Sequence, residues 1–428
     1  MSVLIYSHIS SSRLQYICNF IFQEQLGIAY KLTIDSEAFI AHQGPKINYN
    51  ETSLTSNGFH LAPHPLLFEK TIQPQNTECF EWNNSVAFFK SNTGDLGFDI
   101  FAASFYLLTR YEEYLPHTKD MYGRYPHTAS LAFREGFLNR PIVQIWISHF
   151  AKALQSTFAD ITIKSNLFRY IPTYDIDIAY SYKGKGILRN IGGFLKSPSL
   201  KRLSVLAGLQ KDPYDVYPYL NDLHNKHHLT PIYFFLVAAG RGEYDKNISP
   251  YSHHMWRLFK QHAKKYSIGI HPSWNSYGNV ASIRKEKKIL ETATEKAITQ
   301  SRQHYIRFNL PDSFEQLLDA GITDDYSMGY GSINGFRASV ADSFNWYDLS
   351  KETTTILRIH PFCWMDANSY YEQQQDAATT VSEIAYYYQE CKAVNGQFIT
   401  IVHNNFLGTD ALFKGWRDLY ETFISQLP

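Results

Sequence analysis

The sequence lacks an excess of either charge and any long apolar run. Its 428 residues carry 40 basic and 40 acidic side chains, so the formal net charge is zero. A global positive field of the kind that attracts nucleic acid is therefore excluded. The longest apolar run, 231–239, is far shorter than the roughly 20 residues that a membrane-spanning helix needs, and we interpret it as a buried strand. The N-terminus has no basic segment followed by a long apolar one, so we predict a cytoplasmic protein without a signal peptide.

Cysteine is also scarce, whereas aromatic residues are plentiful. The four cysteines lie far apart and form no C-x-x-C pair, which excludes a disulfide framework and a structural zinc knuckle. The 31 tyrosines and 29 phenylalanines indicate a folded globular protein. Such rings mostly fill cores, but proteins that handle carbohydrate also use them for stacking, so their number favours neither role.

Two parts of the chain differ in their pattern. Residues 1–165 predict a smaller α+β domain, with helices expected at Asp99–Tyr114 and Pro141–Phe158, and they contain no catalytic constellation. In residues 166–428, apolar strand candidates alternate with helical stretches. This alternation predicts an α/β domain with a parallel sheet, either open or closed as a barrel.

Two acids stand at the end of the first strand candidate of the second part. Asp175 and Asp177 alternate with apolar residues in Ile171–Tyr180, and this period of two predicts that both point to one face, about 6 to 7 Å apart. Two like charges at this distance are costly unless a cation, a proton or a substrate neutralises them. The simpler interpretation is that both acids face solvent or an arginine.

Two further strand candidates end in a histidine. His271 follows Ser-Ile-Gly-Ile, and His403 follows Phe-Ile-Thr-Ile-Val. A single histidine is more often an ordinary core or loop residue. Because the carboxyl ends of parallel strands meet at one face, however, the coincidence with the acid pair predicts one shared site.

The motifs around these residues resemble those of a known family. The polysaccharide deacetylase family (NodB-homology, carbohydrate esterase family 4-like) has similar motifs in the same order as Thr173–Asp177, Ile270–Trp274, Gly335–Ala338 and Ile401–Asn404. The whole chain more closely resembles a bacterial subgroup with an extra N-terminal domain, through the segments Asp99–Leu115 and Asp325–Tyr330. The resemblance implies a distorted (β/α) barrel of NodB-homology type, preceded by the smaller α+β domain.

The resemblance also implies a reaction and a cofactor. Members of the family are hydrolases that remove an acetyl group from an N- or O-acetylated sugar or polysaccharide. A divalent metal, zinc or a similar ion, activates the water and stabilises the oxyanion. The expected partner is therefore a carbohydrate substrate and not a nucleic acid.

Individual roles follow from the positions of the motifs. Asp175 corresponds to the general base and His403 to the acid that protonates the leaving group. Arg337 corresponds to the arginine that orients the base and favours its charged form. The remaining positions are metal ligands at Asp177 and His271, with Asn275 as a weak third, and substrate-binding residues at Trp274, Asp325 and Tyr326.

The sequence departs from the family pattern at one ligand. The usual second motif has two histidines at i and i+4, whereas His271 is followed at i+4 by Asn275. An amide oxygen is a poorer zinc ligand than imidazole, so a metal needs another residue here. Composition alone offers His253, His254 and His360 as substitutes.

A basic insert follows the acid pair. Residues 178–210 contain no acid, and the cations of 183–202 alternate with apolar residues. Such a segment could contact an anionic membrane surface or the phosphates of a lipid-linked or nucleotide-linked sugar. It could also be a solvated basic loop.

Three other functions compete with the deacetylase. A catalytically inactive deacetylase-like protein could bind carbohydrate without hydrolysing it. A glycosyltransferase could use the Asp-x-Asp pattern to bind a metal and a nucleotide diphosphate, but this leaves the histidines at the strand ends without a role. A glycosidase fits less well, because its two carboxylates usually come from separate strands about 5 to 10 Å apart.

Overall fold

The computed structural model describes residues 2–164, 166–196, 198–238, 240 and 242–427. The chain forms two compact units, which we describe separately. Unit 1 consists of Met1–Arg169, Gly335–Pro361 and Gln389–Gln397, and unit 2 consists of Tyr170–Asn334, Phe362–Tyr388 and Phe398–Pro428. Residue 165, the predicted end of the first domain, lies outside the described residues.

Unit 1 contains a four-stranded parallel sheet in the order β2-β1-β3-β4. Its strands are β1 (Ser2–Ser7), β2 (Ala29–Thr33), β3 (Lys46–Tyr49) and β4 (Phe59–Leu61). Two antiparallel pairs are formed by β5 (Phe80–Trp82) with β6 (Ser85–Ala87), and by β12 (Phe344–Asp348) with β13 (Thr353–Ile359). The smaller helices are α1 (Ser12–Cys18), α2 (Ser36–Ala41) and α4 (Leu131–Arg134).

The two helices predicted in the N-terminal part are confirmed. They are α5 (Ile142–Thr157), which follows Pro141, and α3 (Ile100–Leu108), which is buried along its whole length. Asp99 caps α3 by accepting hydrogen bonds from two backbone amides. The helix ends earlier than predicted because Arg110 takes a left-handed conformation with φ of 54°.

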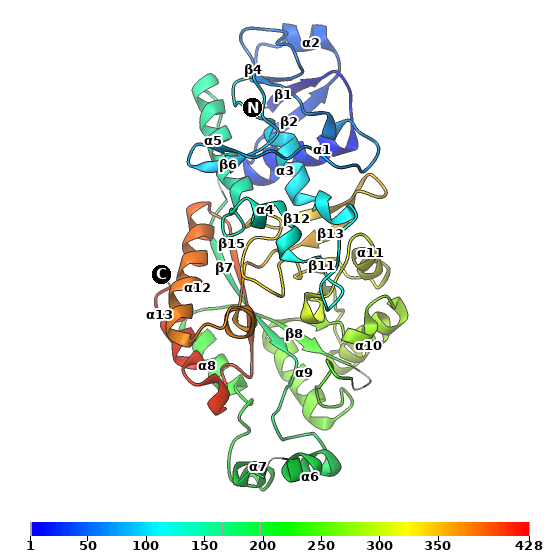
Figure 1. The fold of residues 1–428 in the computed structure, drawn as a ribbon, viewed down its shortest axis with the longest axis vertical. Helices are drawn as coiled ribbons and strands as arrows, with labels where there is room; N and C mark the ends of the chain where they lie inside the picture. Colours follow the sequence, from blue (N-terminus) through cyan, green and yellow to red (C-terminus); the bar gives the residue numbers. More distant parts are fainter. Residues whose placement is uncertain (1, 165, 197, 239, 241, 428) are drawn as a thin grey trace. The chain divides into compact units, whose positions relative to one another are not determined.

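Unit 2 contains a parallel sheet in the order β11-β10-β9-β8-β7-β15-β14. Figure 1 labels β7, β8, β11 and β15 of these strands. The strands are β7 (Arg169–Ile176), β8 (Ile232–Leu236), β9 (Ser267–His271), β10 (Gln300–Ser301), β11 (Asp324–Asp325), β14 (Trp364–Met365) and β15 (Gln397–His403). The strands alternate with α8 (Tyr217–Lys226), α9 (His253–Lys265), α10 (Val280–Thr294), α11 (Asp312–Asp319) and α12 (Ala377–Ala393), and α13 (Trp416–Ser425) follows the last strand. This curled sheet confirms the predicted α/β class with a distorted (β/α) barrel.

The register of the central strands aligns their carboxyl ends. Asp175 pairs with Phe234 on β8, and His271 pairs with Leu236 two residues further along β8. The interior of β8 is fully apolar and buried, as its apolar run predicts; residue 239 of that run lies outside the described residues. The polar side chains at these strand ends are thus held over a rigid core.

Two short helices, α6 (Ile187–Lys196) and α7 (Leu200–Leu206), follow β7. They contain most of the basic insert 183–202, of which Lys183 and Lys185 precede α6 and residue 197 lies outside the described residues. No helix in the described part of the chain is both long and apolar enough to cross a membrane.

Candidate active site and metal centre

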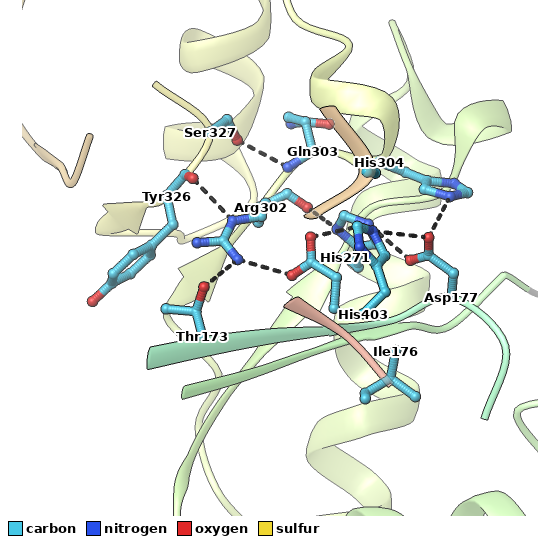
Figure 2. Close-up of polar contacts among 12 residues, drawn as sticks. Thr173, Ile176, Asp177, His271, Arg302, Gln303, His304, Tyr326, Ser327 and His403 are labelled. Atoms are coloured by element: carbon cyan, nitrogen blue, oxygen red, sulfur yellow. Dashed lines mark hydrogen bonds and ion pairs between the residues drawn. The ribbon is translucent and has the colours of Figure 1, made fainter. Parts of the chain in front are cut away.

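Asp175 is buried at the end of β7, with only 2 % of its surface exposed. Its Oδ1 accepts a hydrogen bond from Arg302 Nη1 at 2.9 Å. Arg302 is itself fully buried and fixed by two further acceptors, Thr173 Oγ1 at 2.6 Å and the Tyr326 carbonyl oxygen at 3.0 Å (Figure 2). The guanidinium therefore holds Asp175 in one orientation through a charge-assisted hydrogen bond.

Asp177, one residue beyond β7, is surrounded by three imidazoles (Figure 2). Its Oδ1 lies 3.2 Å from His271 Nε2. Its Oδ2 lies 3.6 Å from His304 Nε2 and 3.5 Å from His403 Nε2. The ligand atoms of Asp177, His271 and His304 all lie within 4.8 Å of one another. This carboxylate and these two nitrogens have the composition of a site for a divalent cation.

The other ring nitrogen of each histidine in this group faces an acceptor. His271 Nδ1 lies 2.5 Å from the Arg302 carbonyl oxygen, and His304 Nδ1 lies 3.1 Å from Asp245 Oδ1. We therefore assign a hydrogen to each Nδ1, which leaves the Nε2 lone pairs directed at Asp177 when the rings are neutral.

The Asp177 carboxylate, which lies between these nitrogens, requires a positively charged partner. Asp177 Oδ1 is buried and has no hydrogen-bond partner in the described part of the chain. Lone pairs that face a carboxylate repel it unless a proton or a cation lies between them. A divalent cation would satisfy Asp177, His271 and His304 together, so these residues fit a metal.

The pKa values of these side chains agree with this geometry. Burial alone lowers the pKa of His304, but Asp177 and Asp245 outweigh it and raise that pKa to about 9. Burial alone raises the pKa of Asp177, but His304, His271 and His403 hold it well below its usual range. A proton on His304 thus offsets the charge of the carboxylate that a cation would otherwise neutralise.

His403 is held by a carboxylate of its own. Its Nδ1 lies 2.6 Å from Asp366 Oδ1, and its backbone amide donates to Asp366 Oδ2 at 2.7 Å. Burial alone lowers the pKa of His403, but Asp366, Asp177 and Asp175 raise it to about 10. His403 is therefore a protonated group directed at the acid pair, as a general acid requires.

The arginine predicted beside the base has a different environment. Arg337 belongs to unit 1, where its Nη2 and Nε donate to Glu113 at 2.6 and 2.8 Å. Arg302 makes the contact with Asp175 that the sequence analysis assigned to Arg337. The role predicted for Arg337 stays a prediction.

The weak third ligand and its proposed substitutes also differ from the prediction. Asn275 is exposed, and its backbone amide lies 3.4 Å from Asp245 Oδ2. His253 and His254 are exposed at the start of α9, and His360 Nδ1 lies 2.8 Å from Ser343 Oγ in unit 1. Among the described residues, the third member of the cation-binding group is His304.

The three predicted substrate-binding residues lie at different depths. Trp274 is half-buried, stacks on Tyr244 with 4.0 Å between ring centroids, and carries Arg307 over its face. Tyr326 is buried, and its carbonyl oxygen accepts the hydrogen bond from Arg302 Nε. Asp325 is fully buried, and burial raises its pKa to about 6 although Ser301 and Ser327 donate to it. Trp274 is thus the most accessible of the three.

Four residues of the site were not predicted from the sequence. Arg302 directly follows β10, Asp366 directly follows β14, His304 lies two residues beyond Arg302, and Asp245 lies between β8 and α9. For Arg302 and Asp366 the signal was a polar residue at the end of a strand, as for His271, and it was hidden because β10 and β14 have only two residues each. His304 and Asp245 lie further beyond the strand ends, where this signal does not apply.

Comparisons with known proteins give one family match and several similar structures. A family of unknown function (DUF7033) matches residues 3–159. No curated protein matches the chain. Among solved structures, a candidate polysaccharide deacetylase from Mycobacterium smegmatis aligns at 12 % identity and a TM-score of 0.40, over 61 % of this chain and 84 % of that one.

Two further structures align over a similar share of the chain. A CE4 family pseudoenzyme from Bacillus anthracis aligns at 10 % identity and a TM-score of 0.31, over 61 % of this chain and 62 % of that one. The catalytic domain of a peptidoglycan N-acetylglucosamine deacetylase from Eubacterium rectale aligns at 11 % identity and a TM-score of 0.29, over 63 % of this chain and 88 % of that one. Because all three TM-scores lie below 0.5, the functional inference depends on the site itself.

Proposed function

We propose that this protein is a metal-dependent hydrolase that removes acetyl groups from an N- or O-acetylated sugar or polysaccharide. The observation that carries the proposal is the arrangement around Asp177. Its carboxylate faces His271 and His304, whose outer nitrogens are fixed by acceptors, while Asp175 lies beside it with its own arginine. This combination supplies a metal site and a base side by side. Residues 166–428 would form the catalytic domain, and residues 1–165 an accessory domain.

The metal would be held by Asp177, His271 and His304. Once bound, a divalent cation such as zinc lowers the pKa of a water and offsets negative charge on the acyl oxygen. The protein's contribution is to fix the ligands. The Arg302 carbonyl and Asp245 hold the two imidazoles by their outer nitrogens, which is the usual function of groups behind a metal ligand.

The proton transfers are assigned to Asp175 and His403. Asp175 takes a proton from the attacking water as the water oxygen bonds to the acyl carbon. His403 Nε2 then gives its proton to the leaving nitrogen or oxygen as the bond from that atom to the acyl carbon breaks. The products are acetate and a free amine or hydroxyl group. Arg302 holds Asp175 in a fixed orientation for accepting the proton, and Asp366 keeps His403 protonated.

An acetate-release assay tests this function. The purified protein, loaded in turn with zinc, cobalt and manganese, is incubated with N-acetylated oligosaccharides and O-acetylated polysaccharides. We expect metal-dependent release that falls by about 10³-fold or more in Asp175→Asn, because the amide cannot accept the proton. Equal release by Asp175→Asn, or no release with any metal, would contradict the proposal.

Binding measurements on the same purified protein distinguish the deacetylase from the competing functions. An inactive carbohydrate-binding protein would bind oligosaccharide in calorimetry and release no acetate. A glycosyltransferase would bind a nucleotide sugar with manganese, and Asp177→Asn would abolish that binding. We expect no binding of nucleotide sugars, because Asp175 is held by a buried arginine and is unavailable to a metal–diphosphate complex.

A further inference from the structure

Helices α6 and α7 and the segment around them form a surface that the proposed reaction does not use. We call residues 183–210 the basic arm. Figure 1 shows α6 and α7 together at one end of unit 2, away from the sheet. Side-chain hydrogen bonds connect the arm to the rest of unit 2: Arg189 Nη2 donates to the Lys246 carbonyl oxygen at 2.7 Å, and Lys201 Nζ donates to the Thr409 carbonyl oxygen at 2.9 Å.

One side of α6 is apolar and open to solvent. Ile187, Leu188, Ile191 and Leu195 lie within about 100° of one another around the helix, since each residue turns it by about 100°. Their exposed fractions are 78 %, 87 %, 53 % and 76 %. Exposed apolar residues are ordinary when scattered singly, but a continuous apolar face on a soluble protein indicates a binding surface.

Helix α7 also carries exposed aliphatic side chains. Leu200, Leu203 and Leu206 are exposed by 81 %, 48 % and 45 %, and Leu209 beyond the helix is exposed by 79 %. The two helices therefore present a run of large aliphatic side chains at one end of unit 2. Unlike an aromatic sugar platform, these side chains offer no ring for stacking.

The polar side of the arm is strongly cationic. Lys185, Arg189, Lys196 and Arg202 border a cavity of about 410 Å³ whose described lining contains no carboxylate. The sequence has no acid between 178 and 210. Asp212, the first acid after the arm, already accepts four backbone hydrogen bonds, from residues 181 to 183 and from Tyr214. Lys183 pairs with Asp215 at 3.4 Å, and the arm as a whole carries a net positive charge beside its apolar face.

We propose that the basic arm docks unit 2 onto the surface of an anionic phospholipid bilayer. The aliphatic side chains of α6 and α7 insert among the lipids, and the cations interact with anionic headgroups. At ten residues, α6 is about 15 Å long, half the thickness of a bilayer core, so it lies in the interface rather than crossing it. Charge complementarity selects this partner over a second copy of the chain, whose arm would carry the same positive charge.

Vesicle co-sedimentation of the full-length protein tests the proposal. The vesicles contain either phosphatidylcholine alone or equal parts of phosphatidylcholine and phosphatidylglycerol. One double variant, Leu188→Ser with Leu195→Ser, removes the apolar contact, and a second, Lys185→Glu with Lys196→Glu, reverses two charges. The matched control is Lys226→Glu with Lys264→Glu, which changes the net charge equally at exposed sites on α8 and α9.

We expect the wild type and the control to sediment with the anionic vesicles, and each arm variant to bind them about tenfold more weakly or worse. All four proteins should have the same thermal transition. Equal binding to both vesicle types, or an equal loss in the control, would overturn the proposal. So would displacement by inorganic phosphate at constant ionic strength, which indicates a site for a free anion. A wild-type dimer that Leu188→Ser with Leu195→Ser separates in sedimentation equilibrium would assign the face to self-association instead.

Discussion

At Asp177, three imidazole nitrogens approach one carboxylate, and the chemistry depends on which of them carry a proton. His271 and His304 have their outer nitrogens on acceptors, so their inner nitrogens are free to ligate when the rings are neutral. His403 has a carboxylate behind it and a raised pKa, so it is the ring best suited to keep its proton. The acceptors behind the three rings thus distinguish two metal ligands, His271 and His304, from one general acid, His403.

The assignment of His304 as a ligand predicts a loss of metal in His304→Ala. We expect the zinc affinity to fall by at least about 10²-fold, because one of three protein ligands is removed. The measurement is the metal content after dialysis against a competing chelator, determined by elemental analysis. His253→Ala is the matched control, since His253 is exposed and lies outside the cation-binding group. Equal zinc in the two variants would exclude His304 as a ligand.

The contrast between two buried arginines gives a second prediction. Arg302→Lys should lower kcat by about 10²-fold, because a single ammonium cannot hold Asp175, Thr173 and the Tyr326 carbonyl together. Arg337→Lys disrupts a buried pair with Glu113 and should lower stability with little change in kcat.

Acetate release and thermal unfolding, measured on both variants, separate the two roles. A large loss of kcat in a folded Arg337→Lys protein, together with normal activity in Arg302→Lys, would instead support the role predicted for Arg337 from the sequence.

Several site residues could be predicted from the sequence, and others could not, for a physical reason. Asp175, His271 and His403 end long apolar strands, whose burial the sequence reveals directly. Arg302 and His304 follow β10, a two-residue strand of polar residues whose pairing with β9 and β11 comes from tertiary structure. His304 takes the place of the histidine that the family pattern has at position 275. It could not be predicted because it lies in a segment without a periodic pattern.

At the scale of helices and strands, long periodic segments could be predicted from the sequence, but the residues at which they end could not. The predicted helix 99–114 ends at Leu108 because Arg110 adopts a left-handed conformation, and its guanidinium bonds to Glu112 and Glu113. A residue of this type has no strong preference for such a conformation, so the sequence alone does not mark the end. The start of the helix at Asp99 is a typical capping position.

The cap of α3 gives a prediction for pH dependence. Burial raises the pKa of Asp99 from 3.8 to about 6, although Tyr49, His64 and two helix amides donate to its ionised form. Folded protein therefore keeps a proton on Asp99 at pH values where the unfolded chain has lost it. The stability that this proton provides is complete below about pH 4 and is lost as the pH rises through about 6.

Urea unfolding of the wild type and Asp99→Asn at pH 4 and at pH 6.5 measures this contribution. The variant cannot titrate there, so the wild type should lose about 2 to 3 kcal/mol relative to it between the two pH values. A difference in the free energy of unfolding that is the same at both pH values would contradict the assignment to Asp99.

At the scale of the whole molecule, the chain passes between its units more than once. Residues 335–361 and 389–397 return to unit 1, while the strands that carry the proposed site belong to unit 2. The family match to residues 3–159 lies entirely within unit 1. It therefore carries no information about the chemistry at Asp177.

A metal in unit 2 should stabilise the folded protein. Zinc at about a thousandfold excess over its dissociation constant adds roughly 4 kcal/mol when it binds only the native state. We expect zinc to raise the unfolding temperature of the wild type in calorimetry and to raise that of His304→Ala by about a third as much or less, because the weaker site is then at most about tenfold above its dissociation constant. An equal increase in both proteins would indicate binding elsewhere.

The identity of the metal ligands is the central claim, and anomalous diffraction at the zinc edge tests it most directly. Crystals of the zinc-loaded protein should show one strong peak about 2.0 to 2.2 Å from a carboxylate oxygen of Asp177 and from Nε2 of His271 and His304. A peak at His253 and His254, or an ordered site at Asp177 without zinc in crystals that hold it elsewhere, would contradict the account.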